Sequence, residues 1–266
     1  MPDLRIATWN VNSVRLRLDG LARLTAEHRP DVICLQEIKA ENDVFPTAAL
    51  TELGYRFQAV HGMKAYHGVA ILSKLPLLDV ATMDWCDRAD CRHVFACLED
   101  GTEIHNFYVP AGGDIPDPEQ NDKFAHKLRF LEDLAEWWAE RRDPAARCIL
   151  VGDLNVAPLE TDVWSHRQLL DVVSHTPAEV TRLGRLQAAH GWVDAVRHFI
   201  PPEEKLYSWW SYRARDWAAS DRGRRLDHVW VTPALAPALR GAEVLRAARG
   251  WPQPSDHVPV MVDLAL

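Results

Sequence analysis

The chain has 266 residues and a formal net charge of −8, with 47% hydrophobic and 26% charged residues. This length and apolar content suffice for one large α/β or sandwich domain with a substantial core. The negative charge argues against a protein that coats nucleic acid nonspecifically, although it leaves open an enzyme that holds a few phosphates locally. No apolar run approaches the roughly 20 residues of a membrane span, so we expect no membrane association.

The cysteines and the N-terminus indicate a cellular compartment. Five cysteines are scattered without a CxxC pair, and Cys34 and Cys148 lie inside apolar, strand-like runs, which is typical of buried free thiols. The first residues contain no charged segment followed by a long apolar stretch, so we expect no secretory signal. We therefore predict a cytoplasmic protein.

The predicted elements alternate between apolar strand-like runs and amphipathic helices. In chain order they are strand 4–11, helix 18–28, strands 31–38, 55–62, 68–74, 93–99 and 103–110, helix 123–142, strand 147–155, helix 176–191, and strands 207–213, 226–232, 242–248 and 258–266. The last helix has the clearest bounds. Thr176 is its N-cap, Pro177 its first residue and Glu179 the partner in a capping box, and Gly191 ends it.

These elements predict an α/β fold of two packed mixed β-sheets flanked by helices. Roughly eleven strands are too many for one ordinary sheet, and the hairpin-like pairs 55–62/68–74 and 93–99/103–110 argue against an all-parallel one. No long linker divides the chain, so we predict a single domain over residues 1–266. The segments IATWNVN and LVGDLNV both end an apolar run in an Asn-bearing turn, which two symmetry-related sheets would produce.

Polar side chains gather at the ends of these apolar runs, where rigid scaffolds present chemistry. They are Asn10, Asn12, Gln36, Glu37, Tyr108, Asp153, Asn155, Asp227, Asp256 and His257. Each one alone is more simply a turn or cap residue. Together they supply what metal-assisted phosphoryl transfer requires: hard oxygen ligands, an imidazole oriented by a carboxylate, and amide and phenol donors.

Six motifs in order resemble the exonuclease III family, DNA-repair enzymes of the endonuclease/exonuclease/phosphatase superfamily. They are WNVNSVR (9–15), LQEIK (35–39), YVP (108–110), GDLN (152–155), RLD (225–227) and SDH (255–257). The resemblance covers nearly the whole chain and implies a four-layered α/β sandwich. It also implies a Mg²⁺-dependent nuclease, with Mn²⁺ as a substitute, that cuts 5′ to abasic sites in double-stranded DNA. Further implied activities are removal of 3′-terminal nucleotides or phosphates, and we expect a monomer.

The same resemblance implies the residues of the metal site. Glu37 matches the main Mg²⁺ ligand, and Asn12 and Asp256 are expected near the metal. Asn10 and Asn155 match amides that position the scissile phosphate and the attacking water.

The remaining catalytic roles also follow from the resemblance. Tyr108 matches a phosphate-side donor, and Asp153 matches the carboxylate proposed to activate the water. Asp256 and His257 are expected to form the carboxylate–imidazole pair, with Asp227 as an alternative partner of the same imidazole. Whether Asp153 or His257 is the general base stays open.

The expected substrate contacts lie at Lys39 and in the segment that follows residue 207. Lys39 either contacts the site or is a solvated surface residue, and we include it among the candidates for substrate binding. In a strand, Trp209 and Trp210 point to opposite faces. We predict Trp210 as the wall of a pocket for a base-free sugar, and Arg213 as a backbone contact. The basic segment 213–225 suits DNA as well, although it could be only a solvated loop.

Two alternatives remain at this stage. Because one fold serves many substrates, a small-molecule or lipid phosphodiesterase or phosphatase is the main rival. A catalytically inactive binding module is disfavoured because no core residue of the motifs is missing. The chain departs from the family at Ala111 and Asp114, where relatives carry amide or basic side chains, so we expect few phosphate contacts there.

Overall fold

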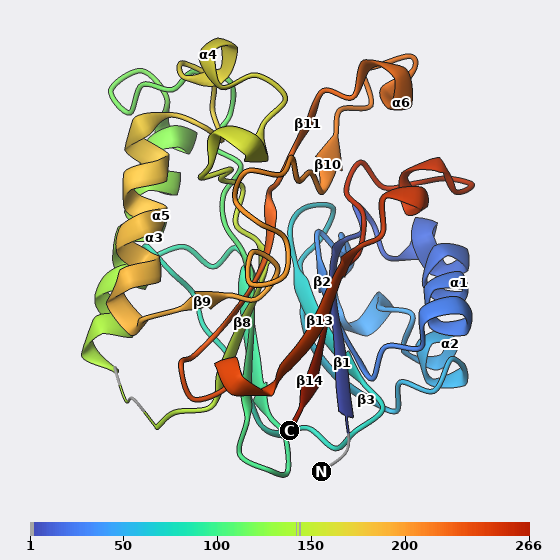
Figure 1. Ribbon diagram of the computed structural model, residues 1–266. Helices are drawn as coiled ribbons and strands as arrows, with labels where there is room; N and C mark the ends of the chain where they lie inside the picture. Colours follow the sequence, from blue (N-terminus) through green and yellow to red (C-terminus); the bar gives the residue numbers. More distant parts are fainter. Residues whose placement is uncertain (1–2, 142, 144) are drawn as a thin grey trace.

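Two β-sheets pack face to face in the computed structural model, which describes residues 3–141, 143 and 145–266 (Figure 1). In these residues the first sheet contains, from edge to edge, β13 (Leu239–Val244), β14 (Val260–Ala265), β1 (Asp3–Asn10), β2 (Val32–Gln36), β4 (Val69–Ser73) and β3 (Phe57–His61). The second contains β5 (Leu78–Thr82), β6 (His93–Cys97), β7 (Glu103–Tyr108), β8 (Cys148–Asp153), β12 (Asp227–Val231) and β9 (Val193–Asp194). The predicted fold of two mixed sheets is confirmed.

The two sheets share one pairing pattern. β1 is parallel to β2, β8 is parallel to β7, and every other neighbouring pair is antiparallel. β1 therefore has the same place in the first sheet as β8 has in the second. This agrees with the symmetry inferred from the similar segments IATWNVN and LVGDLNV, which form β1 and β8.

Helices cover the outer face of each sheet, which gives four layers (Figure 1). α1 (Leu18–His28) and α2 (Thr47–Glu52) lie over the first sheet, and α3 (Asp122–Glu140) and α5 (Pro177–His190) lie over the second. Apolar side chains of both sheets, such as Ile6 and Ile149, form the core between them. α1 has the predicted bounds. α3 begins one residue before the predicted range 123–142 and ends at residue 140, and residue 142 lies outside the described residues.

The capping of α5 is confirmed. Its Thr176 hydroxyl accepts from the Glu179 backbone N–H at 3.3 Å, and the Glu179 carboxylate accepts from the Thr176 N–H at 3.1 Å. Gly191 ends the helix with a φ of 68°, a left-handed conformation that favours glycine. In contrast, the predicted strand 207–213 shrinks to β10 (Trp209–Trp210), which pairs with β11 (Gly223–Arg224).

The architecture gathers loops at one end of the sandwich. The chain termini lie at the opposite end from α4 (His166–Leu169), α6 (Trp217–Ser220), β10 and β11 (Figure 1). Because β1 and β2 run parallel, as do β7 and β8, the residues that follow these four strands meet at the loop end.

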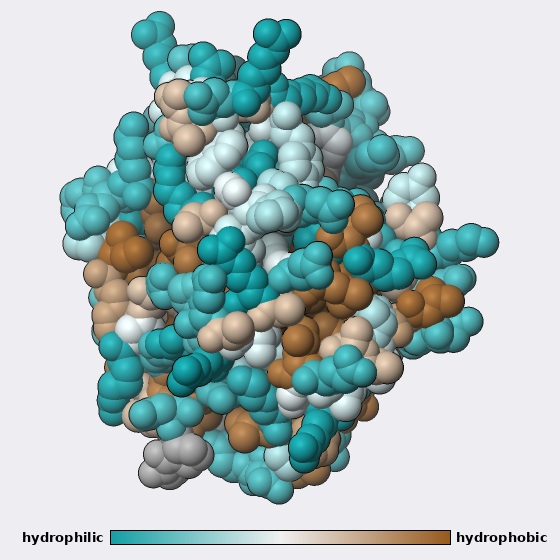
Figure 2. Space-filling view, turned by 90° about the vertical axis from the view of Figure 1, so that its right-hand side faces the viewer, coloured by the Kyte–Doolittle hydropathy of each residue, from teal (hydrophilic) through white to brown (hydrophobic). Residues whose placement is uncertain are grey.

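The outside of the molecule is mixed in polarity. On the face shown in Figure 2, hydrophilic residues predominate and apolar residues form separate small patches. None of the helices in the described ranges has the length and apolar character that crossing a bilayer requires.

Candidate active site

The ends of the central strands bring the predicted residues together. Asn10, at the end of β1, donates from Nδ2 to Glu37 Oε1 at 3.0 Å and to Asp153 Oδ2 at 2.9 Å. Tyr108, at the end of β7, donates from its hydroxyl to Glu37 Oε1 at 2.9 Å. Asn10 and Asp153 come from the two similar strands β1 and β8, so the symmetry of the sheets places them in direct contact.

The imidazole of His257 lies between two carboxylates. Its Nδ1 is 2.8 Å from Asp227 Oδ2, and its Nε2 is 3.6 Å from Asp153 Oδ2. The Ser208 hydroxyl donates to the same Asp227 oxygen at 2.6 Å, which fixes the carboxylate in place. Asp227 and Asp153 both belong to the second sheet, whereas His257 precedes β14 of the first, so the array joins the two sheets.

Asp256 does not pair with this imidazole, so that prediction is wrong. Its Oδ1 accepts from Asn12 Nδ2 at 3.2 Å, and its Oδ2 accepts from the Trp209 indole N–H at 3.0 Å. These bonds hold the Asp256 carboxylate away from the ring of its neighbour His257. The alternative partner, Asp227, takes the role.

Burial and charge shift the acidities in this array. Burial alone would lower the pKa of His257, but the carboxylates of Asp227 and Asp153 outweigh it and raise the pKa to about 10. Burial raises the pKa of Asp153 to about 7, against the opposing effect of the His257 charge. The ring is therefore a cation near neutral pH, which can stabilise negative charge on a phosphate.

Glu37 stays ionised although it is largely buried. Burial opposes its charge, but the hydrogen bond from Asn10 and the ammonium of Lys39 lower its pKa. Lys39 Nζ lies 2.9 Å from Glu37 Oε2 and 2.5 Å from Asn12 Oδ1. Lys39 thus contacts two of the residues whose oxygens are expected to hold Mg²⁺, although its side chain stays partly exposed.

The donor set fits a divalent cation. Glu37, Asn12 and Asp256 supply oxygens on one side, and hard oxygen ligands are what Mg²⁺ prefers. On the other side, ligand atoms of Asp153, Asp227 and His257 all lie within 4.8 Å of one another. Asp227 Oδ1 is buried, and among the described residues it has no hydrogen-bond partner.

Four site residues have left-handed backbones. The φ angles are 45° at Asn12, 49° at Glu37, 50° at Lys39 and 53° at Asn155. Such angles are tolerated by Asn but strained for Glu and Lys. The loops after β1 and β2 bond to each other, with the Ser13 N–H donating to the Glu37 carbonyl at 2.8 Å, and this pairing holds the strained conformation.

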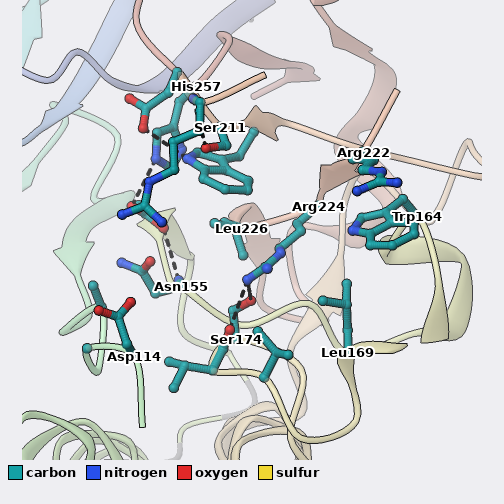
Figure 3. Close-up of a pocket in the computed structure, with 18 of the residues that line it drawn as sticks. Asp114, Asn155, Trp164, Leu169, Ser174, Ser211, Arg222, Arg224, Leu226 and His257 are labelled. Atoms are coloured by element: carbon teal, nitrogen blue, oxygen red, sulfur yellow. Dashed lines mark hydrogen bonds and ion pairs between the residues drawn. The ribbon is translucent and has the colours of Figure 1, made fainter. Parts of the chain in front are cut away.

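A cavity of about 710 Å³ extends from these residues toward the loops (Figure 3). Its lining includes Asn155 and His257 at the catalytic end, Arg222 and Arg224 farther out, and also Arg213. Arg213 thus lies where a contact with bound substrate is feasible, as the sequence suggested.

Trp209 lines this cavity and Trp210 does not. Trp210 is only 1% exposed, donates its indole N–H to Asp221 at 3.0 Å, and packs against Tyr207 and Trp217. The predicted alternation of the two side chains is correct, but the choice of Trp210 as the pocket wall is wrong. In a two-residue strand both faces carry an indole, so alternation alone cannot select the face.

Some site residues had weak or no signals in the sequence. Arg222 and Arg224 belong to the basic segment singled out above, but nothing marked Trp164, which also lines the cavity. Lys127 on α3 is fully buried, and its ammonium donates to the Asn155 carbonyl at 2.7 Å. An isolated lysine on an amphipathic helix gives no hint of such a distant partner.

Comparisons with known proteins identify relatives of this chain. Residues 7–257 match the Endonuclease/Exonuclease/phosphatase family. Exodeoxyribonuclease III of Haemophilus influenzae is 29% identical over 98% of this chain and 99% of its own length. An exodeoxyribonuclease of Bacillus subtilis is 30% identical over 97% of this chain and 98% of its own.

Solved structures of other nucleases and phosphatases are also similar to this chain over nearly its whole length. An AP endonuclease from Archaeoglobus fulgidus superposes with a TM-score of 0.91 at 32% identity, covering 99% of this chain and 100% of its own. A 3′ phosphatase from Neisseria, bound to a product DNA hairpin, superposes with a TM-score of 0.90 at 31% identity and the same coverage. The chain belongs to the Endonuclease/Exonuclease/phosphatase family.

Proposed function

We propose that this protein is a Mg²⁺-dependent DNA-repair phosphodiesterase that cuts 5′ to abasic sites in duplex DNA and processes 3′ ends. The observation that carries the proposal is the Asp227–His257–Asp153 array, which lies beside the ionised Glu37 and is joined to it by Asn10. The full-length similarity to exodeoxyribonuclease III and to an AP endonuclease supports DNA as the substrate.

The metal is the first part of the proposal. Glu37, Asn12 and Asp256 would hold Mg²⁺, for which Mn²⁺ can substitute, and Lys39 would turn from these oxygens to the phosphate. A bound metal supplies electrophilic polarisation of the phosphate.

The proton chemistry is the second part. Asp153 is the better proton acceptor because the two carboxylates keep His257 charged, and a charged ring cannot take a proton from water. His257 faces the developing negative charge of the phosphate, and Asp227 holds its orientation. Tyr108 and Asn155 donate to the phosphate and to the water.

The cavity is the third part. A residue without a base leaves the duplex at the least cost, so it can enter the cavity beside the catalytic groups. Trp209 replaces Trp210 as the proposed wall, and Arg213 contacts the DNA backbone. We further propose that residues 1–266 act as one monomeric unit in the cytoplasm, which the five free cysteines of the structure suit.

The substrate class decides between this proposal and a small-molecule or lipid phosphodiesterase. Purified protein with Mg²⁺ is given three substrates: a labelled duplex with one abasic analogue, the undamaged duplex, and inositol phosphate or phospholipid vesicles. We expect one cut 5′ to the lesion, with a 3′-hydroxyl product. Hydrolysis of the inositol phosphate or phospholipid without any cleavage of DNA would contradict the proposal.

A further inference from the structure

One wall of the cavity is built from two arginine–tryptophan pairs. The guanidinium carbon of Arg222 lies 4.6 Å from the ring centroid of Trp164, and that of Arg224 lies 5.3 Å from the ring centroid of Trp209. All four side chains line the cavity, and Figure 3 shows Arg222 over the Trp164 ring. We call these four residues the Arg–Trp wall.

Within the described ranges neither arginine of this wall forms an ion pair with a carboxylate, although Arg224 lies within electrostatic range of the buried Glu179. Arg224 donates to the Val173 carbonyl at 2.9 Å and to the Ser174 hydroxyl at 2.7 Å, and its buried Nε has no partner there. The next residue, Arg225, behaves differently, because its guanidinium is buried in ion pairs with two aspartates. Glu179 is already paired with Lys127, so the partly buried Arg224 has no counter-ion of its own, which is costly unless a bound anion compensates it.

The opposite rim of the cavity offers no such cations. Segment 111–122 contains four carboxylates and neither Lys nor Arg, and its Asp114 lines the cavity. Among the described residues that line the cavity, the arginines are Arg213, Arg222 and Arg224, so none comes from segment 111–122. A phosphate that enters with the substrate is drawn toward these arginines.

We propose that Arg222 and Arg224 bind the phosphate on the 3′ side of the abasic residue at the cut, while Trp164 and Trp209 contact its sugar. This inference rests on the proposed function. Cleavage leaves a 3′-hydroxyl on the retained strand, so the residue that leaves the helix and enters the cavity lies on the 3′ side of the cut. Its following phosphate is then the anion closest to the wall.

The test compares two duplexes that differ in this phosphate. One carries an internal abasic analogue, and the other ends at a recessed 3′ terminus in the same analogue without a further phosphate. The measured quantity is the ratio of kcat/KM for cleavage at the internal analogue to kcat/KM for removal of the terminal analogue. For Arg222→Gln/Arg224→Gln we expect this ratio to fall about tenfold, because charge-assisted hydrogen bonds are lost only with the internal substrate.

Arg246→Gln is the matched control. Its guanidinium also stacks on two indoles, those of Trp210 at 5.0 Å and Trp217 at 5.3 Å, but it does not line the cavity. We expect the ratio in this variant to equal that of the parent protein. An unchanged ratio in the double variant, or an equal fall in the control, would overturn the inference.

Two further results distinguish failure of this inference from a folding defect and from failure of the proposed function. Arg222 is exposed and makes no hydrogen bond in the described part of the chain, so Arg222→Gln alone should fold and should show a smaller fall of the same ratio. If the parent protein cuts both duplexes and neither variant changes the ratio, only the Arg–Trp wall is refuted. If the parent protein cuts neither duplex, the proposed function itself fails.

Discussion

His257 is held by Asp227 on one side and faces Asp153 on the other, and each contact has a separate consequence for the reaction. Asp153→Asn and His257→Ala remove groups that act mainly in the transition state. We expect turnover to fall by about 10²- to 10⁴-fold, with little change in the affinity for abasic duplex. Single-turnover kinetics and a binding titration measure the two effects separately. A variant that loses binding and keeps its maximal rate would show that the residue is misassigned.

The adjacent tryptophans offer a second residue-scale prediction. Trp210→Ala opens a hole in a packed core and should lower the free energy of unfolding by about 3–5 kcal/mol. Trp209→Ala should lower the free energy of unfolding less. It should reduce the ratio of the cleavage rate of abasic duplex to that of intact duplex, because Trp209 lines the cavity. Urea unfolding and the ratio of the two cleavage rates are the measurements. The opposite assignment of the two effects would contradict the structure.

At the scale of residues, the sequence predicted which residue types form the site better than it predicted their interaction partners. The motifs identified Asp227, Asp256 and His257, but two carboxylates were available for one imidazole, and only the fold decides between them. The role of Lys39 stayed open in the sequence because a charged residue that closely follows a site residue in the chain is usually solvated. Its contacts with Glu37 and Asn12 depend on the joining of two loops that are distant in sequence.

At the scale of elements, one buried ion pair connects two helices to the catalytic loop. Lys127 of α3 and Glu179 of α5 are both fully buried and form an ion pair. Lys127 also donates to the Asn155 carbonyl, and Glu179 accepts from the backbone N–H groups of Ser174 and Thr176. The pair therefore fixes the loop after β8 to the outer helical layer.

We expect Lys127→Met to lower the free energy of unfolding by about 3–5 kcal/mol, because it leaves the Glu179 charge buried and unpaired. Adding Glu179→Gln should recover much of this loss. Lys123→Met on the same helix is the control, since Lys123 is exposed and such changes usually stay within about 0.5 kcal/mol. Equal stability of the Lys127 and Lys123 variants in urea would refute the role of the pair.

Elements with strong local signals were predictable, and short ones were not. α5 has a cap, a proline and a terminal glycine within its own sequence, so its bounds could be predicted. β5 and α2 lack such signals, because β5 is a largely exposed edge strand and α2 is only six residues long. The two residues of β10 are a strand only because β11 lies beside them.

At the scale of the whole molecule, buried neutral histidines predict acid sensitivity. Burial lowers the pKa of His93, His105 and His228, the last to about 4. Below about pH 6.5 the unfolded chain gains protons that the folded protein does not, so stability is complete above this pH and is lost as pH falls. Each histidine contributes a slope of up to about 1.4 kcal/mol per pH unit.

Urea unfolding at pH 7, 6 and 5 tests this prediction. His228→Gln removes one titrating group and should make the decline shallower than in the parent protein. His257 has a raised pKa, so its contribution to stability is complete below pH 6.5 and declines only at higher pH. The raised pKa of Asp153 lets the folded protein gain a proton there as pH falls from 7 to 5, which offsets about one histidine and leaves a net decline from the others. A free energy of unfolding that stays constant from pH 7 to pH 5 would contradict the prediction.

The most direct measurement is cleavage of a duplex with one abasic analogue under control of the metal. We expect Mg²⁺ to support a single cut 5′ to the lesion, excess chelator to abolish it, and added Mg²⁺ or Mn²⁺ to restore it. Glu37→Ala should remain inactive in Mg²⁺, because it loses the carboxylate at the centre of the site. Full cleavage in chelator, or undiminished cleavage by Glu37→Ala, would contradict the account.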